Sequence, residues 1–321
     1  MPRPALPLIM IAALSGAAAA IAAGAMRYEG MCDASAAVAI DARHFIVASD
    51  EDNRLRIYRR DEPRVLEVVA LQAFLGTAED GESDLEGAAR VGQRTYWIAS
   101  HGRNSKGKAQ PDRQRFFATE VVAGSAGPRV EPVGAPQRQL LADLMAAPTL
   151  REWRLAEAAR RAPEAPGGLN IEGLAEGPAG SLLIGLRNPL REGRALVVPL
   201  LNPDEFLRGS HARFGAPSGL DLGGRGVRSI GRTDGAYLIV AGPIADAGDF
   251  ALYRWTGHEA DAPRRLTGVD LGDLRPEALF VWPDDGRVEL LSDDGGVERH
   301  GRACKDRPPV AQSFRALTIR P

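Results

Sequence analysis

Five segments of the chain share one pattern of apolar and polar positions. In each, a short apolar strand is followed by a turn and by a second apolar strand that ends in a polar or glycine-rich loop; the segments are residues 33–53, 84–104, 170–189, 226–243 and 275–295. With Ser35, Glu86, Glu172, Arg228 and Glu277 taken as equivalent, the spacings are 51, 86, 56 and 49 residues. Four-stranded units of about 50 residues are typical of β-propeller blades. The pattern therefore predicts an all-β protein.

Each unit continues with further strand-like stretches. These are residues 55–59 and 65–71, 115–122 and 129–133, 195–201 and a short stretch before Asp221, 250–255 and 264–269, and 314–319. We expect five four-stranded blades in one domain over residues 26–321, and we expect this domain to be a monomer. A strand contributed across the junction of the two chain ends would complete the last blade.

The 86-residue spacing requires additional structure. Residues 137–161 have apolar positions at helical spacing, and Thr149 to Glu152 has the form of a capping box. The Pro-Gly-Gly sequence at 166–168 is typical of a return loop. We predict a helical insertion over residues 137–168, between the second and third blades. A degenerate sixth blade is the alternative, and the missing strand periodicity argues against it.

The N-terminal segment differs from the rest of the chain. Arg3 precedes an apolar run from Leu6 to Met26, and Ala23 and Ala25 are small residues of the kind found at signal-peptidase sites. This predicts a signal peptide over residues 1–25 and a periplasmic or secreted protein. An uncleaved anchor is the alternative, although most of the run is alanine and no basic stop-transfer cluster follows. No second segment of the sequence is apolar enough to span a membrane.

The composition of the chain bears on nucleic-acid binding and on the disulfide bonds that the protein can form. The chain has 40 Lys and Arg against 42 Asp and Glu, a net charge of −2, so nucleic acid is not an expected partner. Its 36 glycines and 23 prolines are consistent with a fold rich in turns. Cys32 and Cys304 lie near opposite ends of the mature chain. Export favours a disulfide between them, and two buried free thiols are the alternative.

The equivalent positions also indicate where a site would lie. The innermost strand of a blade lines the central channel and the second strand runs antiparallel beside it, so the start of the first and the end of the second reach one face. Glu86, Glu172 and Glu277 start first strands, and Asp50 and Asp293 end second strands. Converging carboxylates are costly unless a cation neutralises them. Because oxygen ligands favour Ca²⁺ or Mg²⁺, these five residues are the predicted metal ligands.

Three further residues are candidates for catalysis. We assign His101 the acid/base role, and Arg103 and Arg187 the stabilisation of an anionic substrate or transition state. Structural roles compete with all of these assignments, because a strand-start glutamate can lock neighbouring blades and His101 lies in a turn-like sequence. The sequence contains no nucleophile elbow, HExxH, P-loop or Rossmann glycine pattern, so no nucleotide cofactor is expected.

Several of these segments resemble the bacterial proteins grouped as the DUF3616 family. The similar sequences are residues 32–36, 50–53, 84–87, 100–104, 170–174, 186–189 and 292–295. The resemblance implies the fold, and it implies no activity because the family is of unknown function. More distantly, the Asp/Asn-x-Glu-Gly sequence is similar to that of phytase-like (esterase-like) propeller proteins. It covers Glu86 and Glu172, and Glu277 is a looser match because Pro276 precedes it and Ala278 replaces the glycine.

Three classes of function are compatible with these features. The first is an exported propeller that binds a divalent cation and hydrolyses a small anionic substrate, a phosphoester or another ester, at the channel mouth. The second is a non-enzymatic propeller that binds a ligand or protein in the cell envelope. The third, a structural assembly protein, predicts a large exposed apolar patch, for example on the insertion. Convergence of the five carboxylates on one point would favour the first.

Overall fold

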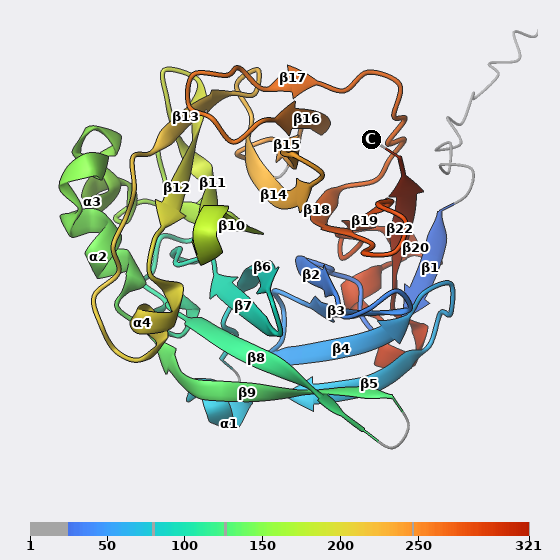
Figure 1. Ribbon diagram of the computed structural model, residues 1–321. Helices are drawn as coiled ribbons and strands as arrows, with labels where there is room; N and C mark the ends of the chain where they lie inside the picture. The colour runs from blue at the N-terminus through green and yellow to red at the C-terminus, as the bar shows by residue number, and fades with distance from the viewer. Residues whose placement is uncertain (1–24, 79–80, 125–126, 246, 321) are drawn as a thin grey trace, which may run out of the picture.

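The computed structural model describes residues 25–320, apart from 79–80, 125–126 and 246. The chain forms five four-stranded antiparallel sheets in a ring around a central channel, which makes it a five-bladed β-propeller (Figure 1). The predicted all-β fold and blade number are confirmed. Within the described residues, the stretch between the second and third blades contains helices in place of a sixth blade.

In the first four blades the strands follow one another outward from the channel. Blade 1 comprises β2 (Ala36–Ala39), β3 (His44–Ala48), β4 (Arg54–Arg59) and β5 (Val65–Ala70), and blade 2 comprises β6 (Leu85–Val91), β7 (Arg94–Ala99), β8 (Phe116–Ala123) and β9 (Pro128–Gln137). Blade 3 comprises β10 (Asn170–Glu176), β11 (Leu182–Arg191), β12 (Arg194–Leu200) and β13 (Ser218–Asp221), and blade 4 comprises β14 (Gly226–Thr233), β15 (Ala236–Gly242), β16 (Ala251–Trp255) and β17 (Arg264–Arg265). The last strand of blade 4 is thus shorter than the expected 264–269.

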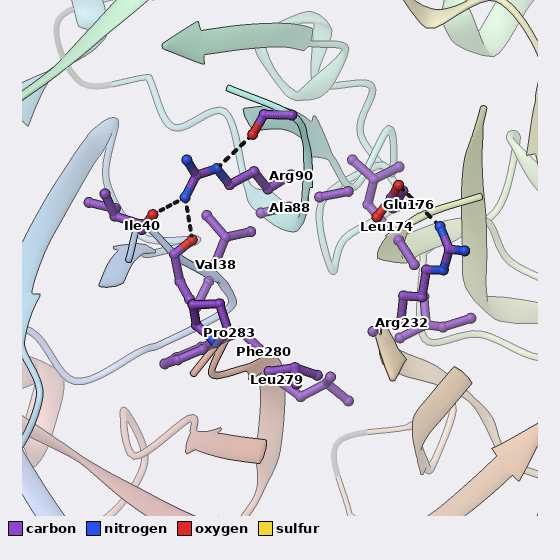
Figure 2. A pocket seen from close by; sticks show the side chains of 18 residues that line it. Val38, Ile40, Ala88, Arg90, Leu174, Glu176, Arg232, Leu279, Phe280 and Pro283 are labelled. Atoms are coloured by element: carbon purple, nitrogen blue, oxygen red, sulfur yellow. Dashed lines mark hydrogen bonds and ion pairs between the residues drawn. The ribbon is translucent and has the colours of Figure 1, made fainter. Parts of the chain in front are cut away.

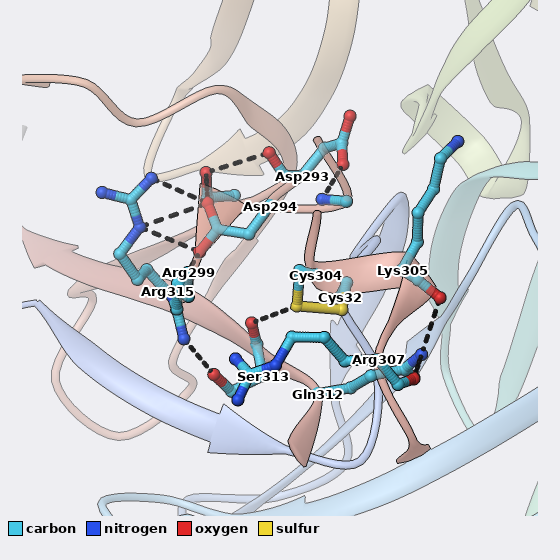
Figure 3. The surroundings of a disulfide bond; sticks show 12 residues. Cys32, Asp293, Asp294, Arg299, Cys304, Lys305, Arg307, Gln312, Ser313 and Arg315 are labelled. Carbon is cyan, nitrogen blue, oxygen red and sulfur yellow. Dashed lines mark hydrogen bonds and ion pairs between the residues drawn. A yellow bond between two sulfur atoms is a disulfide. The ribbon is translucent and has the colours of Figure 1, made fainter. Parts of the chain in front are cut away.

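Blade 5 combines both ends of the described chain. It comprises β18 (Pro276–Val281), β19 (Val288–Ser292), β22 (Ser313–Ile319) and β1 (Met26–Glu29), and a two-stranded hairpin of β20 (Glu298–Arg299) and β21 (Arg302–Ala303) precedes β22. The expected strand across the junction is therefore β1, which pairs antiparallel with β22. Cys32 and Cys304 form the expected disulfide beside this closure, with 5.9 Å between their Cα atoms. Figure 3 shows this bridge and its surroundings.

The core lies between adjacent blades. The outer strand β5 alternates partly buried with exposed residues, whereas β15 is buried along its whole length because both of its faces are covered. Between blades 1 and 5, Phe45 stacks on Phe280 with 5.1 Å between ring centroids and meets Trp282 edge-on at 5.8 Å. Such contacts fix the blades relative to one another and leave the channel to be lined by the innermost strands.

The helical insertion is present between blades 2 and 3. It consists of α2 (Leu140–Ala146), the 3₁₀-helix η2 (Pro148–Trp153) and α3 (Leu155–Ala158), whose apolar side chains join the core of blades 2 and 3 (Figure 1). The expected capping box is wrong, because Pro148 starts η2 and places Thr149 one residue inside it, where the hydroxyl does not cap. Arg154, with φ of 51°, then separates η2 from α3.

Short helices occupy several loops. They are α1 (Gln72–Leu75), η1 (Pro111–Arg113), η3 (Pro178–Gly180), α4 (Pro203–Leu207), η4 (Cys304–Asp306) and η5 (Pro309–Ala311). In the part of the chain that the structure describes, no helix has the length and apolar character needed to cross a bilayer. The predicted signal peptide lies outside the described residues, except for Ala25. Among the exposed large apolar residues described, Leu66 and Val68 lie together on β5, and Met145 alone lies on the insertion.

Candidate functional site

Four innermost strands carry a β-bulge at the same position. The strand register shifts at Glu86 in β6, Glu172 in β10, Arg228 in β14 and Glu277 in β18. A bulge leaves one residue without a cross-strand partner and redirects its side chain. All four of these residues line one cavity at the end of the channel. In blade 1 the equivalent Ser35 instead donates a hydrogen bond from Oγ to the Leu85 carbonyl, at 2.6 Å, and so joins two blades.

The glycine after each bulged glutamate of the Glu-Gly sequence has a packing role. A Cβ atom at Gly87 would lie 3.0 Å from the Cβ of Leu174, and one at Gly173 would lie 2.9 Å from the Ile230 side chain. Both neighbours belong to the innermost strand of the next blade. The glutamate carboxylate thus turns toward the channel directly before a glycine that lies close to the next innermost strand.

The cavity at this end of the channel is strongly acidic. It has a volume of about 650 Å³, and ten Asp and Glu residues but only five Arg and Lys residues line it. All five predicted metal ligands and Arg187 are among the lining residues. The excess of acidic groups requires neutralisation by protons or by cations from solution.

We call the carboxylates of Asp33, Asp50, Asp84, Glu86 and Asp293 the acidic half of the cavity. Within it, one carboxylate oxygen from each of Asp50, Asp84 and Glu86 lies within 4.8 Å of the others. Glu86 is only 8% exposed, and among the described residues its carboxylate has no hydrogen-bond or ion-pair partner. One oxygen of Asp50 is also buried without a partner there. The structure therefore groups two predicted ligands with Asp84.

Burial makes this group costly to ionise. It raises the pKa of Glu86 well above its usual range, and repulsion from Glu172 and Asp84 adds to the effect. Burial raises the pKa of Asp50 in the same way, with further repulsion from Asp33 and Asp293. It raises the pKa of Asp84 to about 6, although Arg113 opposes the shift from 2.8 Å. A bound cation would relieve these unfavourable interactions.

Asp33 and Asp293 form a second carboxylate pair beside this group. They are joined by an antiparallel bridge between opposite ends of the chain. Burial, and then a hydrogen bond with Asp293, raises the pKa of Asp33 to about 8. Gly295 donates its N–H to Asp293 Oδ1 at 2.8 Å, and a Cβ at Gly295 would collide with Asp33 Oδ1. The close approach of the pair thus depends on a glycine.

We call Arg187, Arg228, Glu172 and Glu277 the arginine half of the cavity. Glu172 Oε1 lies 3.0 Å from Arg187 Nη1, and its Oε2 lies 2.9 Å from Arg228 Nε. Arg228 also pairs with Glu277, and its guanidinium lies 5.6 Å from the centroid of the Phe250 ring. Burial lowers the pKa of Arg228, while Glu172 opposes the shift. Two predicted ligands, Glu172 and Glu277, are therefore held by arginines.

His101 and Arg103 do not contribute to the described lining of this cavity. His101 is 3% exposed, and neither ring nitrogen has a hydrogen-bond partner among the described residues. Burial, aided by Arg115, lowers the pKa of His101 to about 3. Arg103 donates hydrogen bonds to the carbonyls of Ala159, at 2.8 Å, and Gly107, at 3.0 Å. Their catalytic roles remain predictions, and these positions favour structural roles.

Sequence reasoning missed Asp33 and Asp84. Asp84 starts the Asp-x-Glu-Gly sequence, and its φ of 57° turns the chain just before the bulge, so the motif itself carried a signal. Asp33 directly follows a disulfide cysteine, but its contact with Asp293 arises only when the ring closes. No local pattern indicates that contact.

The opposite end of the channel has different chemistry. A cavity of about 520 Å³ there is lined by the far ends of the same innermost strands, with apolar groups such as Val38, Leu174 and Leu279 (Figure 2). Arg90 donates to the backbone carbonyls of Ala39 and Ile40, and Glu176 pairs with Arg232 at 3.1 Å. The acidic half and the arginine half thus lie at one end of the channel, and the apolar cavity lies at the other.

Comparison with known proteins supports the resemblance seen in the sequence. The family model DUF3616, described as a protein of unknown function, matches residues 135–278. No curated protein matches the chain. Its structure is similar to Myxococcus xanthus glutaminyl cyclase, with 12% identity, a TM-score of 0.44, and coverage of 91% of this chain and 94% of that one.

Two further solved structures are similar at the same level. A putative oxidoreductase (glucose dehydrogenase) from Thermus thermophilus is 16% identical, with a TM-score of 0.44 and coverage of 92% of this chain and 100% of that one. A GH43_1 enzyme from Xanthomonas citri is 11% identical, with a TM-score of 0.46 and coverage of 90% and 89%. These likenesses assign no activity to the present chain.

Proposed function

We propose that the protein binds a divalent cation of the Ca²⁺ or Mg²⁺ class in the acidic half of the cavity and uses it to hydrolyse a small phosphoester or other ester. The group formed by Asp50, Asp84 and Glu86 carries this proposal. Its ligand atoms lie within 4.8 Å of one another, and the buried Glu86 carboxylate has no partner among the described residues. A cation would satisfy that carboxylate and offset the repulsion between the three groups.

The donor set favours a hard cation. All three candidate ligands are carboxylates, and none is His or Cys. Ca²⁺ accepts six to eight oxygen ligands in irregular geometry, so water and substrate oxygens would complete the coordination. We also propose that the protein is exported, since the Cys32–Cys304 disulfide is compatible with an oxidising compartment.

Hydrolysis in this cavity would use groups on both sides of it. A divalent cation held by Asp50, Asp84 and Glu86 would supply Lewis-acid activation of the ester and of the attacking water. In the reaction, the water oxygen bonds to phosphorus or to the acyl carbon, the bond to the ester oxygen breaks, and the alcohol leaves with a proton. Arg187 and Arg275, which line the cavity, would hold the anionic part of the substrate.

A non-enzymatic ligand-binding role is the second candidate. It is favoured by the arrangement of the arginine half, because Arg187 and Arg228 already form ion pairs with Glu172 and Glu277, which offset their positive charges. It is also favoured by the position of His101, the predicted acid/base group, which is not among the described residues that line the cavity. A cation bound together with a ligand, without turnover, would neutralise the carboxylates of Asp50, Asp84 and Glu86 equally well.

Glu86→Gln is expected to weaken Ca²⁺ binding by about tenfold or more, because it removes one of three negative ligands. Isothermal titration of the chelator-treated mature protein with CaCl₂ measures this. Glu176→Gln is the matched control, since Glu176 lies on an innermost strand at the opposite end of the channel. We expect its Ca²⁺ affinity to equal that of the wild type.

The same proteins would then be tested for hydrolysis of p-nitrophenyl phosphate and p-nitrophenyl acetate. Cation-dependent turnover that is lost in Glu86→Gln and kept in Glu176→Gln supports the hydrolase. Ca²⁺ binding without turnover of any ester favours the non-enzymatic role. Absence of both Ca²⁺ and Mg²⁺ binding by the wild type contradicts the cation site itself.

A further inference from the structure

Lys305 occupies an unusual place in this molecule. The sequence contains three lysines, Lys106, Lys108 and Lys305, and all the others of its 40 Lys and Arg residues are arginine. Lys305 is the one lysine among the described residues that line the acidic cavity. Lys305 has no role in the proposed hydrolysis.

The backbone of Lys305 is fixed next to the acidic half. It directly follows Cys304, which is fully buried and disulfide-bonded to Cys32 (Figure 3). Its N–H donates to the Gly295 carbonyl at 3.2 Å, and its own carbonyl accepts a hydrogen bond from Gln312 Nε2, also at 3.2 Å. Asp33 directly follows Cys32, and Lys305 directly follows Cys304. The disulfide therefore connects two segments whose next residues, Asp33 and Lys305, both line the cavity.

The side chain of Lys305 is less constrained than its backbone. Its ammonium lies 3.0 Å from Glu51 Oε1, and the side chain is 52% exposed. The hydrogen bond to Glu51 raises the pKa of Lys305, and the charges of Asp33 and Asp50 add to this effect. The ammonium therefore lies in the field of the acidic half. Its one direct ion pair among the described residues is with Glu51, which is outside the Asp50–Asp84–Glu86 group.

We propose that Lys305 is an intrinsic counter-cation of the acidic half, and that its charge sets the affinity of this site for a divalent cation. The inference rests on the proposed function for the identity of the bound ion. A fixed positive charge near the carboxylates lowers their repulsion in the cation-free protein, and the same charge repels an incoming divalent ion. A lysine suits this role because its compact ammonium on a flexible stem can withdraw toward solvent.

The test compares Lys305→Met with two matched variants. Lys305→Arg keeps the charge at the same position, and Lys108→Met removes one lysine charge from an exposed position outside the described cavity lining. In titrations with CaCl₂ at low ionic strength, we expect Lys305→Met to bind Ca²⁺ about three- to tenfold more tightly than the wild type. The other two variants should stay within about twofold, and 0.5 M NaCl should reduce the gain because the ammonium is half exposed.

Thermal unfolding of the cation-free proteins gives a readout that does not require Ca²⁺. Lys305→Met should unfold about 2 °C or more below Lys305→Arg at pH 9, where Asp33, with its pKa of about 8, is ionised and lacks this counter-ion. Equal Ca²⁺ affinities and equal unfolding temperatures for the two Lys305 variants would overturn the inference and leave the proposed cation site intact. If no variant binds Ca²⁺ but Lys305→Met is selectively destabilised, the counter-cation role stands and the proposed function fails. If no variant binds Ca²⁺ and Lys305→Met is as stable as Lys305→Arg, the counter-cation role and the proposed cation site are both overturned.

Discussion

Arg228→Met is expected to lower the free energy of unfolding by about 3–5 kcal/mol. Arg228 is 6% exposed and contacts Glu172, which is 2% exposed, and Glu277, which is 8% exposed. Removing its charge leaves Glu277 without this cation and Glu172 with Arg187 alone. The loss exceeds that of the Arg228 contacts themselves, because two buried carboxylates then lack compensation. Urea unfolding monitored by tryptophan fluorescence measures it.

Arg232→Met provides the matched control. Arg232 lies on the same strand, β14, and its ion pair with Glu176 is substantially exposed, with side-chain exposures of 49% and 37%. Exposed pairs contribute about 0–1 kcal/mol, so this variant should be nearly as stable as the wild type. A double variant, Arg228→Met with Glu277→Gln, should recover part of the lost stability. Equal stabilities of Arg228→Met and Arg232→Met would contradict the buried network.

Replacing His101 with asparagine is expected to remove a strong acid sensitivity of the fold. The pKa of His101 in the folded protein is about 3, against 6.5 for an unperturbed imidazole. The unfolded chain therefore binds a proton below pH 6.5 that the folded chain does not bind until about pH 3. The stability that this histidine contributes is fully present above pH 6.5 and is lost as the pH falls toward 3.

The size of this effect follows from the same values. Between pH 6.5 and pH 4, wild-type stability should fall by about 3 kcal/mol relative to His101→Asn. Asparagine is suitable because position 101 has a φ of 55°, which asparagine tolerates better than most residues. Urea unfolding of both proteins across this pH range is the measurement. Parallel pH profiles would show that the buried imidazole is protonated in the folded protein or is solvated there.

Most of the fold could be predicted from the sequence because each blade is a local unit. The apolar pairs in residues 33–53 and 84–104 become the first two strands of blades 1 and 2, and the long spacing after Glu86 accommodates the helical insertion. The capping box failed for a local reason, since Pro148 determines where η2 begins. The closure of the ring was predictable because the last repeat lacked its fourth strand, and the N-terminal end of the chain could supply one, which is β1.

The candidate site was less predictable because it depends on contacts between blades. The equivalence of Glu86, Glu172, Arg228 and Glu277 was visible as a repeat, and it corresponds to a shared bulge. The partner of each residue was not visible. Glu172 and Glu277 meet Arg228 from the blade between theirs, whereas Glu86 meets Asp84 and Asp50. Equivalent positions thus acquire different chemistry from their neighbours in the ring.

The proposed cation site of Asp50, Asp84 and Glu86 can be tested by a crystal structure of the mature protein grown with CaCl₂, with the ion located by its anomalous scattering. We expect a Ca²⁺ ion with oxygens of all three carboxylates at about 2.3–2.6 Å. An acidic half that binds no ion at millimolar Ca²⁺, with Glu86 turned to a protein hydrogen-bond partner, would contradict the proposal.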